Sequence, residues 1–190
     1  MSNPLSELAQ KYGSDKCPEI KHNYTPFYYE FLKDKDIKKI VEVGVGDADE
    51  MAWSGVPNYV TGASVHMWSD FFPEAKVFGM DIKPNCVFEE GNIKTIQGNH
   101  NDRDALLNLV FTSGTDVDLV IEDGSHRPAD QVFVCKTLMP LLDDNVIYII
   151  EDVAHPEIAE QLSEYDVFIP QFKRSSADDR VLVVTKKKHE

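Results

Sequence analysis

Basic residues are scarce in this 190-residue chain. Only 19 Lys and Arg stand against 33 Asp and Glu, which gives a formal net charge of −14. A protein that binds a nucleic-acid backbone needs a basic surface, and the one basic run here is Lys186-Lys187-Lys188, which we interpret as a solvated end. The composition therefore excludes nucleic acid as an expected partner and disfavours a strongly anionic substrate.

Long apolar runs and paired cysteines are also missing. No stretch approaches the roughly 18 apolar residues that a membrane span needs, and the N-terminus has no signal-peptide pattern. The three cysteines, Cys17, Cys86 and Cys135, are odd in number and widely separated, which argues against a disulfide framework or a zinc knuckle. We expect a cytoplasmic protein without membrane contact.

The chain does contain short β-branched, apolar runs that alternate with helical segments. With 42% hydrophobic residues it can form one domain over residues 1–190, and the alternation indicates a doubly wound, Rossmann-like α/β sheet with helices on both faces. The last two expected strands, 166–169 and 180–185, are joined by a connection without a helix, so the final strand should be antiparallel. The prediction is a seven-stranded, mostly parallel sheet with one antiparallel strand.

Two acidic groups follow two of these runs directly. Asp123-Gly124-Ser125-His126 comes after residues 117–121, and Glu151-Asp152 comes after 146–150. In open α/β sheets, ligands bind beyond the carboxyl ends of the strands, so these groups should converge. Clustered carboxylates repel one another unless a cation neutralises them, and oxygen ligands favour Mg²⁺ first, then Mn²⁺ or Ca²⁺. His126 could serve as a neighbouring general base. The alternative is that Asp and Gly are ordinary turn residues here.

Other strand ends carry features of nucleotide binding. Gly44 and Gly46 follow the strand around Glu42, and their spacing permits a tight turn close to a ligand. Asp49 stands where the dinucleotide fingerprint requires a third glycine, which weakens that interpretation. Asp81 ends the second strand, where a carboxylate can accept both ribose hydroxyls. Segment 99–101 could contact an adenine edge. Plain turn chemistry remains the alternative for both the glycines and Asp81.

Two further regions are expected to border the site. Residues 1–35 predict a helical cover, whose aromatic residues should pack on the sheet, with Tyr24 or Lys16 closing over a ligand as the alternative. Residues 47–62 lack periodicity and predict a substrate loop, in which Trp53 and Tyr59 could meet a substrate. Ser64 is expected to cap the helix that follows, and Asp102 the helix from Arg103.

These motifs together resemble class I S-adenosylmethionine-dependent methyltransferases. More narrowly, the chain is similar to the metal-dependent sugar O-methyltransferases of macrolide biosynthesis and to the related cephalosporin-hydroxylase-like group. The resemblance covers roughly residues 8–155 and is carried by residues 11–16, Tyr24-Thr25-Pro26, residues 42–46, residues 64–68, Phe72-Pro73, residues 79–82, residues 123–126 and residues 150–152. It does not extend to the extra N-terminal domain of the macrolide enzymes, and the 47–62 loop is this chain's own.

The resemblance implies a role for each matching position. It makes Asp123, Glu151 and Asp152 the Mg²⁺ ligands, with Mn²⁺ as a substitute, and His126 the general base. His126 and Asp123 would be the catalytic residues. It assigns the S-adenosylmethionine cofactor to Glu42, Gly44, Gly46, Ser64, Asp81, Asn99, His100, Asp102 and Asp123. Within that set, Glu42, Gly44 and Gly46 would hold the methionine portion, Asp81 the ribose, and residues 99–102 the adenine.

The expected activity is methyl transfer to a sugar hydroxyl of a glycan, glycoside or natural product. Two adjacent hydroxyls could grip Mg²⁺ in a bidentate manner, which predicts an acceptor with vicinal hydroxyls. The alternatives are a catechol-type small-molecule O-methyltransferase, a cephalosporin-hydroxylase-like metal enzyme and a non-catalytic cofactor-binding subunit. A single His among three carboxylates counts against an iron site with two His ligands. The acceptor, the hydroxyl that is methylated, and whether the chain forms a homo-oligomer stay open.

Overall fold

A single sheet forms the centre of the computed structural model, which describes residues 3–56 and 59–188. Its strand order is β3-β4-β2-β1-β5-β6-β8-β7. The strands are β1 Lys39–Val43, β2 Lys76–Asp81, β3 Glu89–Glu90, β4 Ile93–Gln97, β5 Leu119–Glu122, β6 Ile147–Ile150, β7 Asp166–Phe168 and β8 Leu182–Thr185. Strands β4, β2, β1, β5 and β6 pair in parallel, as the alternating pattern predicts.

The described sheet has eight strands, and the predicted number of seven was wrong. The additional strand, β3, comprises only Glu89–Glu90 and pairs antiparallel with β4. Two exposed glutamates carry no hydrophobic alternation, so the sequence pattern gave no signal for this strand. The last strand, β8, is antiparallel to both β6 and β7, as the helix-free connection predicts. Two strands, β3 and β8, are therefore antiparallel to their parallel neighbours, whereas one was predicted.

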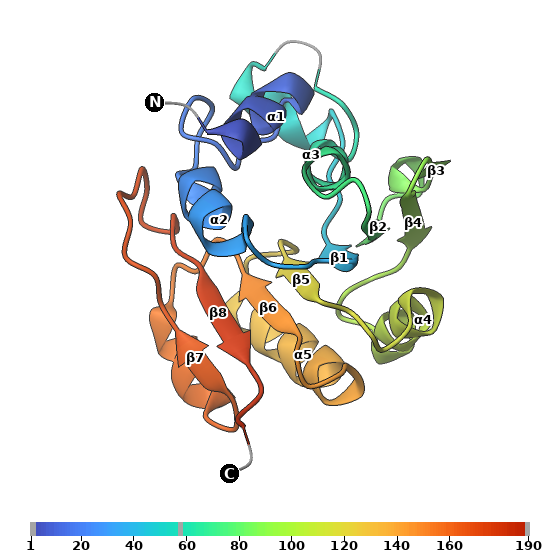
Figure 1. The fold of residues 1–190 in the computed structure, drawn as a ribbon, viewed down its shortest axis with the longest axis vertical. Coiled ribbons are helices and arrows are strands. Elements are labelled where there is room, and N and C mark those ends of the chain that lie inside the picture. The colour runs from blue at the N-terminus through green and yellow to red at the C-terminus, as the bar shows by residue number, and fades with distance from the viewer. Residues whose placement is uncertain (1–2, 57–58, 189–190) are drawn as a thin grey trace.

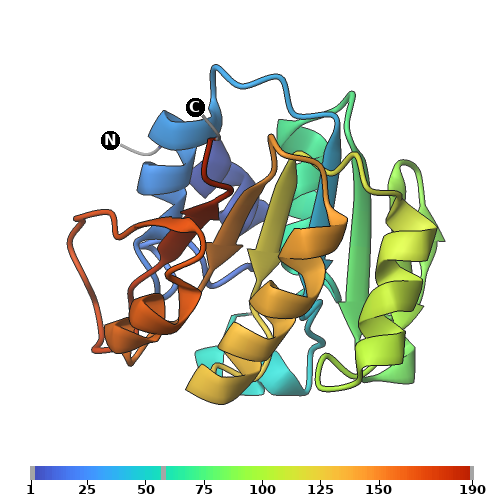
Figure 2. The same cartoon turned by 90° about the horizontal axis from the view of Figure 1, so that it is seen from below.

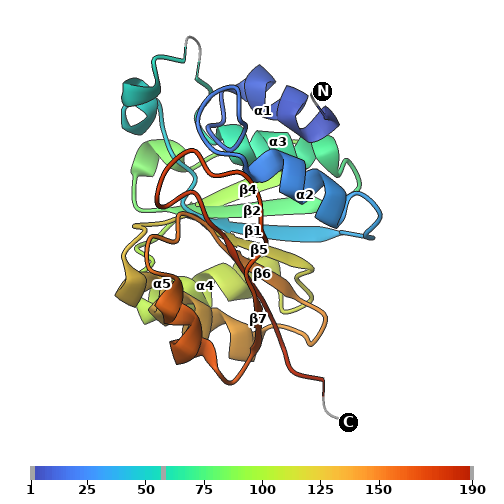
Figure 3. The ribbon, with the colours of Figure 1, turned by 90° about the vertical axis from the view of Figure 1, so that its left-hand side faces the viewer.

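Helices cover both faces of the sheet (Figures 1 and 3). Helices α1 Pro4–Tyr12, α2 Tyr24–Leu32 and α3 Ala63–Phe71 lie on one face, and α4 Arg103–Ser113 and α5 Pro128–Leu138 on the other, where Figure 2 shows them in front of the strands. Short 3-10 helices complete the set: η1 Glu50–Ser54, η2 Pro84–Cys86, η3 Met139–Leu141 and η4 Pro156–Leu162. Among the described helices, none has the length and apolar character to cross a lipid bilayer.

The hydrophobic core is divided by the sheet into two clusters. Trp68, Tyr28 and Leu5 are fully buried with one face of the strands, while Leu106, Cys135 and Tyr148 are fully buried with the other. Strand residues therefore contribute to both clusters in alternation, because successive side chains of a strand point to opposite faces. The buried runs seen in the sequence are explained by this double cover.

Helix starts confirm one capping prediction and correct another. The Asp102 side chain accepts a hydrogen bond from the backbone N–H of Asp104 at 2.9 Å, and so caps α4. Ser64 was expected to cap α3, but that helix begins at Ala63 after Gly62, whose φ is +72°. Ser64 is thereby placed inside the first turn, where its side chain faces the cavity described next.

Candidate active site

A cavity of about 390 Å³ opens at the carboxyl ends of the central strands. Strand β1 has β2 on one side and β5 on the other, and the chain order reverses at this point. Such a switch point is where open α/β sheets bind ligands. Residues that line the cavity follow β1 (Gly44, Gly46), β2 (Asp81, Ile82), β4 (Gly98, His100), β5 (Asp123, Ser125, His126) and β6 (Asp152).

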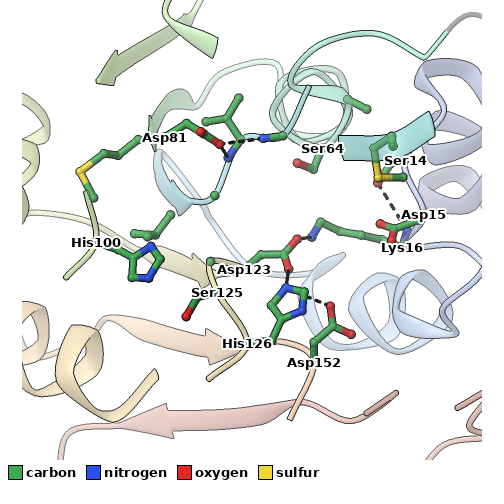
Figure 4. A pocket seen from close by; sticks show the side chains of 18 of the residues that line it. Ser14, Asp15, Lys16, Ser64, Asp81, His100, Asp123, Ser125, His126 and Asp152 are labelled. Carbon is green, nitrogen blue, oxygen red and sulfur yellow. Dashed lines mark hydrogen bonds and ion pairs between the residues drawn. The ribbon is translucent and has the colours of Figure 1, made fainter. Parts of the chain in front are cut away.

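Asp123, His126 and Asp152 meet at one side of this cavity (Figure 4). The His126 Nε2 lies 3.0 Å from Asp123 Oδ1 and 3.3 Å from Asp152 Oδ2. His126 and Asp152 have φ values of +58° and +51°, a left-handed conformation that non-glycine residues seldom adopt. Residues held in such conformations cluster at functional sites, and both of these bring a ligand atom toward the same point.

Lys16 reaches the same carboxylates from inside the protein. Its side chain is 2% exposed, and its Nζ lies 2.5 Å from Asp123 Oδ2 and in closer contact with Glu151 Oε2. The Nζ is also 3.6 Å from Glu42 Oε1. An ammonium buried this deeply is stable only when carboxylates pair with it. From the sequence, Lys16 is only an alternative residue that closes over a ligand, and the structure brings Lys16 to the centre of the acidic cluster.

Two tyrosines of α2 complete the inner side of the cluster. The Tyr24 hydroxyl donates to Asp152 Oδ1 at 2.7 Å, and the Tyr28 hydroxyl donates to Glu151 Oε1 at 2.6 Å. His22 is also buried here, with its Nε2 3.2 Å from Asp152 Oδ1. The aromatic pattern of α2 predicted packing against the sheet, which is correct for the rings. Sequence alone did not indicate that the hydroxyls donate hydrogen bonds to carboxylates.

The cluster shifts the pKa values of its members in opposite directions. Burial alone would raise the pKa of Asp123, but the charges of Lys16 and His126 hold it well below its ordinary value. Burial would lower the pKa of His126, yet the hydrogen bond and charge of Asp123 raise it to about 9. Burial raises the pKa of Glu151, against the charge of Lys16, and it raises the pKa of Glu42 to about 7.

The glycine turn after β1 is needed for protein packing as well as for the cavity. Gly44 has φ +94°, and a Cβ at this position would lie 1.9 Å from the carbonyl oxygen of Asp123. Glycine is thus required where the β1 turn passes the β5 turn. Asp81 accepts backbone N–H groups of Val45, Gly46 and Lys83 at 2.9, 3.0 and 2.9 Å. Because two carboxylate oxygens offer about four acceptor positions, Asp81 retains capacity toward the cavity.

The remaining expected cofactor residues divide between the cavity and its surroundings. Ser64 and His100 line the cavity. Asn99 accepts the backbone N–H of Asn101 within a turn, and Asp102 caps α4. Glu42 is fully buried behind the lining residues, beside Lys16. In the segment 47–62, Met51 and Tyr59 line the cavity, while the side chain of Trp53 lies outside the described part of the chain.

The donor atoms fit a hard divalent cation. One atom each from Asp123, His126 and Asp152 lies within 4.8 Å of the others, a spacing that one ion can bridge. The two carboxylates favour Mg²⁺ or Mn²⁺, and the imidazole beside them would then be free to act as a base. Glu151 was expected as a third carboxylate ligand, and in this structure its oxygens contact Lys16 and Tyr28.

Comparison with known proteins finds methyltransferases that are similar to this chain. It is 33% identical over 151 residues to mycinamicin VI 2''-O-methyltransferase of Micromonospora griseorubida. It is 33% identical over 152 residues to 8-demethyl-8-alpha-L-rhamnosyl tetracenomycin-C 2'-O-methyltransferase of Streptomyces olivaceus. Each match covers 78% of this chain, and the chain spans little more than a third of these relatives, 36% and 37% of their lengths.

A solved methyltransferase structure is also similar to this chain. The methyltransferase MycE of the mycinamycin pathway, in complex with Mg, SAH and mycinamycin VI, superposes with a TM-score of 0.76 at 26% identity. The match covers 97% of this chain and 55% of that one. No protein-family model matches the chain. By sequence and by fold, this chain is similar to sugar O-methyltransferases of macrolide and tetracenomycin biosynthesis.

Proposed function

We propose that this protein is a divalent-metal-dependent O-methyltransferase that uses S-adenosylmethionine and acts on a sugar hydroxyl. The observation that carries the proposal is the meeting of Asp123, His126 and Asp152 at the cavity edge, at the switch point of the sheet. Relatives that match 78% of the chain are O-methyltransferases named for glycosylated natural products. A catalytic imidazole, a cation site and a cofactor cavity side by side are the parts that this chemistry needs.

The metal site would be formed by Asp123 and Asp152, while Glu151 would remain behind it in contact with Lys16 and Tyr28. When bound, the ion supplies positive charge that favours loss of a proton from a weakly acidic hydroxyl. Asp123 and Asp152 each turn one oxygen toward the point that His126 also faces. Positive charge held by these carboxylates would offset their effect on the pKa of His126, so that the imidazole could accept a proton near neutral pH.

The cavity would hold the cofactor along the glycine turn. Gly44, Gly46 and Ser64 would contact its methionine portion, with Glu42 and Lys16 providing charge behind them. Asp81 would accept the ribose hydroxyls, and Gly98 and His100 would border the adenine. The cofactor supplies the methyl group. The chain's own residues orient the reacting groups in line and take up the proton at His126 Nε2.

The acceptor side would be formed by the segment 47–62. Met51 and Tyr59 line the cavity together with Ser14 and Asp15. An acceptor with two adjacent hydroxyls, as found in sugars, suits a cation that keeps open coordination positions. The −14 charge of the chain favours a neutral or cationic acceptor over a polyanionic one.

Calorimetry tests this proposal directly. S-adenosylmethionine and its demethylated product would be titrated into the protein with and without Mg²⁺, and into the Asp123→Ala variant. We expect micromolar cofactor binding to the wild type that persists in the variant, together with Mg²⁺ binding that the variant loses. Absence of cofactor binding under all conditions would refute the proposed activity. A screen of glycosylated acceptors would follow a positive result.

A further inference from the structure

The two carboxylates at the cavity edge are held in the same way. Each has one oxygen bound from inside the protein and the other directed to the cavity. Asp123 Oδ2 binds the Lys16 ammonium at 2.5 Å, and Asp123 Oδ1 faces His126 Nε2 at 3.0 Å. Asp152 Oδ1 accepts from the Tyr24 hydroxyl at 2.7 Å, and Asp152 Oδ2 faces the same imidazole nitrogen at 3.3 Å.

Both inner partners come from one short N-terminal segment. Lys16 lies between α1 and α2, and Tyr24 is the first residue of α2, whereas the carboxylates follow β5 and β6. Lys16 and Tyr24 are each at most 1% exposed, so water does not compete for their contacts. Lys16 contacts three carboxylates and the Tyr24 hydroxyl contacts Asp152 twice, so each side chain has little rotational freedom and its carboxylate partner is fixed with it.

The Tyr24 hydroxyl contacts the main chain of Asp152 as well as its carboxylate. The Tyr24 hydroxyl oxygen accepts a hydrogen bond from the backbone N–H of Asp152 at 3.2 Å and donates one to Asp152 Oδ1. One hydroxyl therefore holds both the main chain and the side chain of Asp152. That residue has φ +51°, a conformation that its surroundings must enforce. The Tyr24 hydroxyl is therefore part of what keeps the strained turn in place.

We infer that Lys16 and Tyr24 are positioning residues, which turn Asp123 Oδ1 and Asp152 Oδ2 toward a divalent cation. This inference rests on the proposed metal site, and it assigns the N-terminal segment to that site rather than to a simple cover. Groups that orient metal ligands from behind are commonly worth ten- to a hundredfold in metal affinity. The loss of either contact should therefore weaken cation binding without removing a ligand.

Tyr24→Phe is the sharper test, because it removes one hydroxyl and leaves the ring. Mn²⁺ would be the probe, with its dissociation constant measured by electron paramagnetic resonance, and binding of the demethylated cofactor would be measured separately without metal. The matched control is Tyr29→Phe on the same helix, where the ring packs against Phe71. We expect Tyr24→Phe to weaken Mn²⁺ binding about tenfold or more. Cofactor binding and the Tyr29→Phe values should stay within twofold of the wild type.

Lys16→Met provides the second arm, with Lys11→Met as its control at the surface ion pair with Asp70. We expect weakened Mn²⁺ binding in the first variant alone. If Lys16→Met does not fold, Tyr24→Phe still decides. This inference alone would be overturned if the wild type binds Mn²⁺ and Tyr24→Phe binds it equally well. It would also be overturned if Tyr24→Phe loses Mn²⁺ binding and cofactor binding to the same extent. Wild-type protein that binds the cofactor but no Mn²⁺ would overturn the metal site and the inference, and protein that binds neither would overturn the proposed function as well.

Discussion

At the scale of single residues, the acidic cluster combines groups that would be unstable alone. Glu42, Asp123 and Glu151 are near one another at the strand ends, and the buried ammonium of Lys16 contacts all three. Removing one partner of a buried ion pair commonly costs about 3–5 kcal/mol, since it leaves an uncompensated charge. The charged groups of the cluster therefore stabilise one another. The oxygens of Asp123 and Asp152 that face the cavity stay available to a ligand.

His126 should be needed for chemistry and dispensable for cofactor binding. If it is the general base, His126→Ala should lower kcat about 10²- to 10⁴-fold, because general-base catalysis contributes rate factors of that size. Affinity for the demethylated cofactor should change little, since the imidazole lies beside Asp123 and Asp152, where the metal site is proposed. The measurement is steady-state methyl transfer together with calorimetry. His155→Ala, at an exposed His that contacts Glu157, is the control. Undiminished transfer by His126→Ala would exclude this role.

At the scale of elements, close packing between neighbouring turns decides the geometry of the site. The turn after β1 passes so near the turn after β5 that only glycine fits at position 44. On the other side of the cavity, α3 is joined to α1 and to the β3 region by stacked rings. His66 lies between Tyr12, at a centroid distance of 5.3 Å, and Phe88, at 5.5 Å. Substitutions at Gly44 and at His66 should therefore affect the stability of the fold in different ways.

Gly44→Ala should be severely destabilising, and Gly55→Ala should not. Both glycines have positive φ, +94° and +64°, so each substitution brings similar backbone strain, on the order of 1 kcal/mol. At Gly44 the new Cβ must also displace the Asp123 carbonyl, whereas nothing lies within 4 Å at Gly55. Chemical denaturation should show a loss of at least about 3 kcal/mol for the first variant and about 1 kcal/mol for the second. Equal losses would contradict the packing argument.

The stability of the α1–α3 contact should depend on pH through His66. Burial lowers the pKa of His66 below its ordinary value of 6.5, with only partial opposition from Glu90 and Asp70. The unfolded chain therefore binds a proton more readily, and stability present above pH 6.5 is lost as the pH falls through the lowered pKa. His66→Gln should show a smaller decrease in Tm than the wild type between pH 7.5 and 5. A parallel decrease in both proteins would show that His66 has no such effect.

At the scale of the whole molecule, the excess of negative charge would favour cation binding, as the proposed cation site does. Acidic residues outnumber basic ones by 33 to 19, and several of the buried ones gather at a single cavity. Self-repulsion of this kind lowers the stability of a compact chain and favours binding of cations.

Divalent cations should therefore raise the Tm of the protein. A ligand that binds only the folded state stabilises it by about 2.7 kcal/mol at a concentration 100 times its dissociation constant. Thermal unfolding with Mg²⁺ or Mn²⁺ at matched ionic strength should show an increase that Asp123→Asn abolishes. An increase of the same size in that variant would indicate general screening of the −14 charge rather than a site.

The sequence by itself determined the layers of this fold and which polar residues follow its central strands. Alternating apolar runs specify buried parallel strands, because their side chains must be covered on both faces, and residues after such strands reach the same edge. Asp123, His126 and Asp152 could be expected together on this ground, and the structure brings them within bridging distance. The two-residue strand β3 and the start of α3 could not be predicted, since neither has a periodic signal.

Tertiary structure alone decided which groups stand behind the carboxylates. Lys16 is 107 residues from Asp123 along the chain, and Tyr24 is 128 residues from Asp152. No local pattern links residues so far apart, because their contact depends on how α2 and the preceding turn pack over the strand ends. The sequence thus specified the acids that a cation could bind. Only the packing of the N-terminal segment determined which oxygen of each acid faces the cavity.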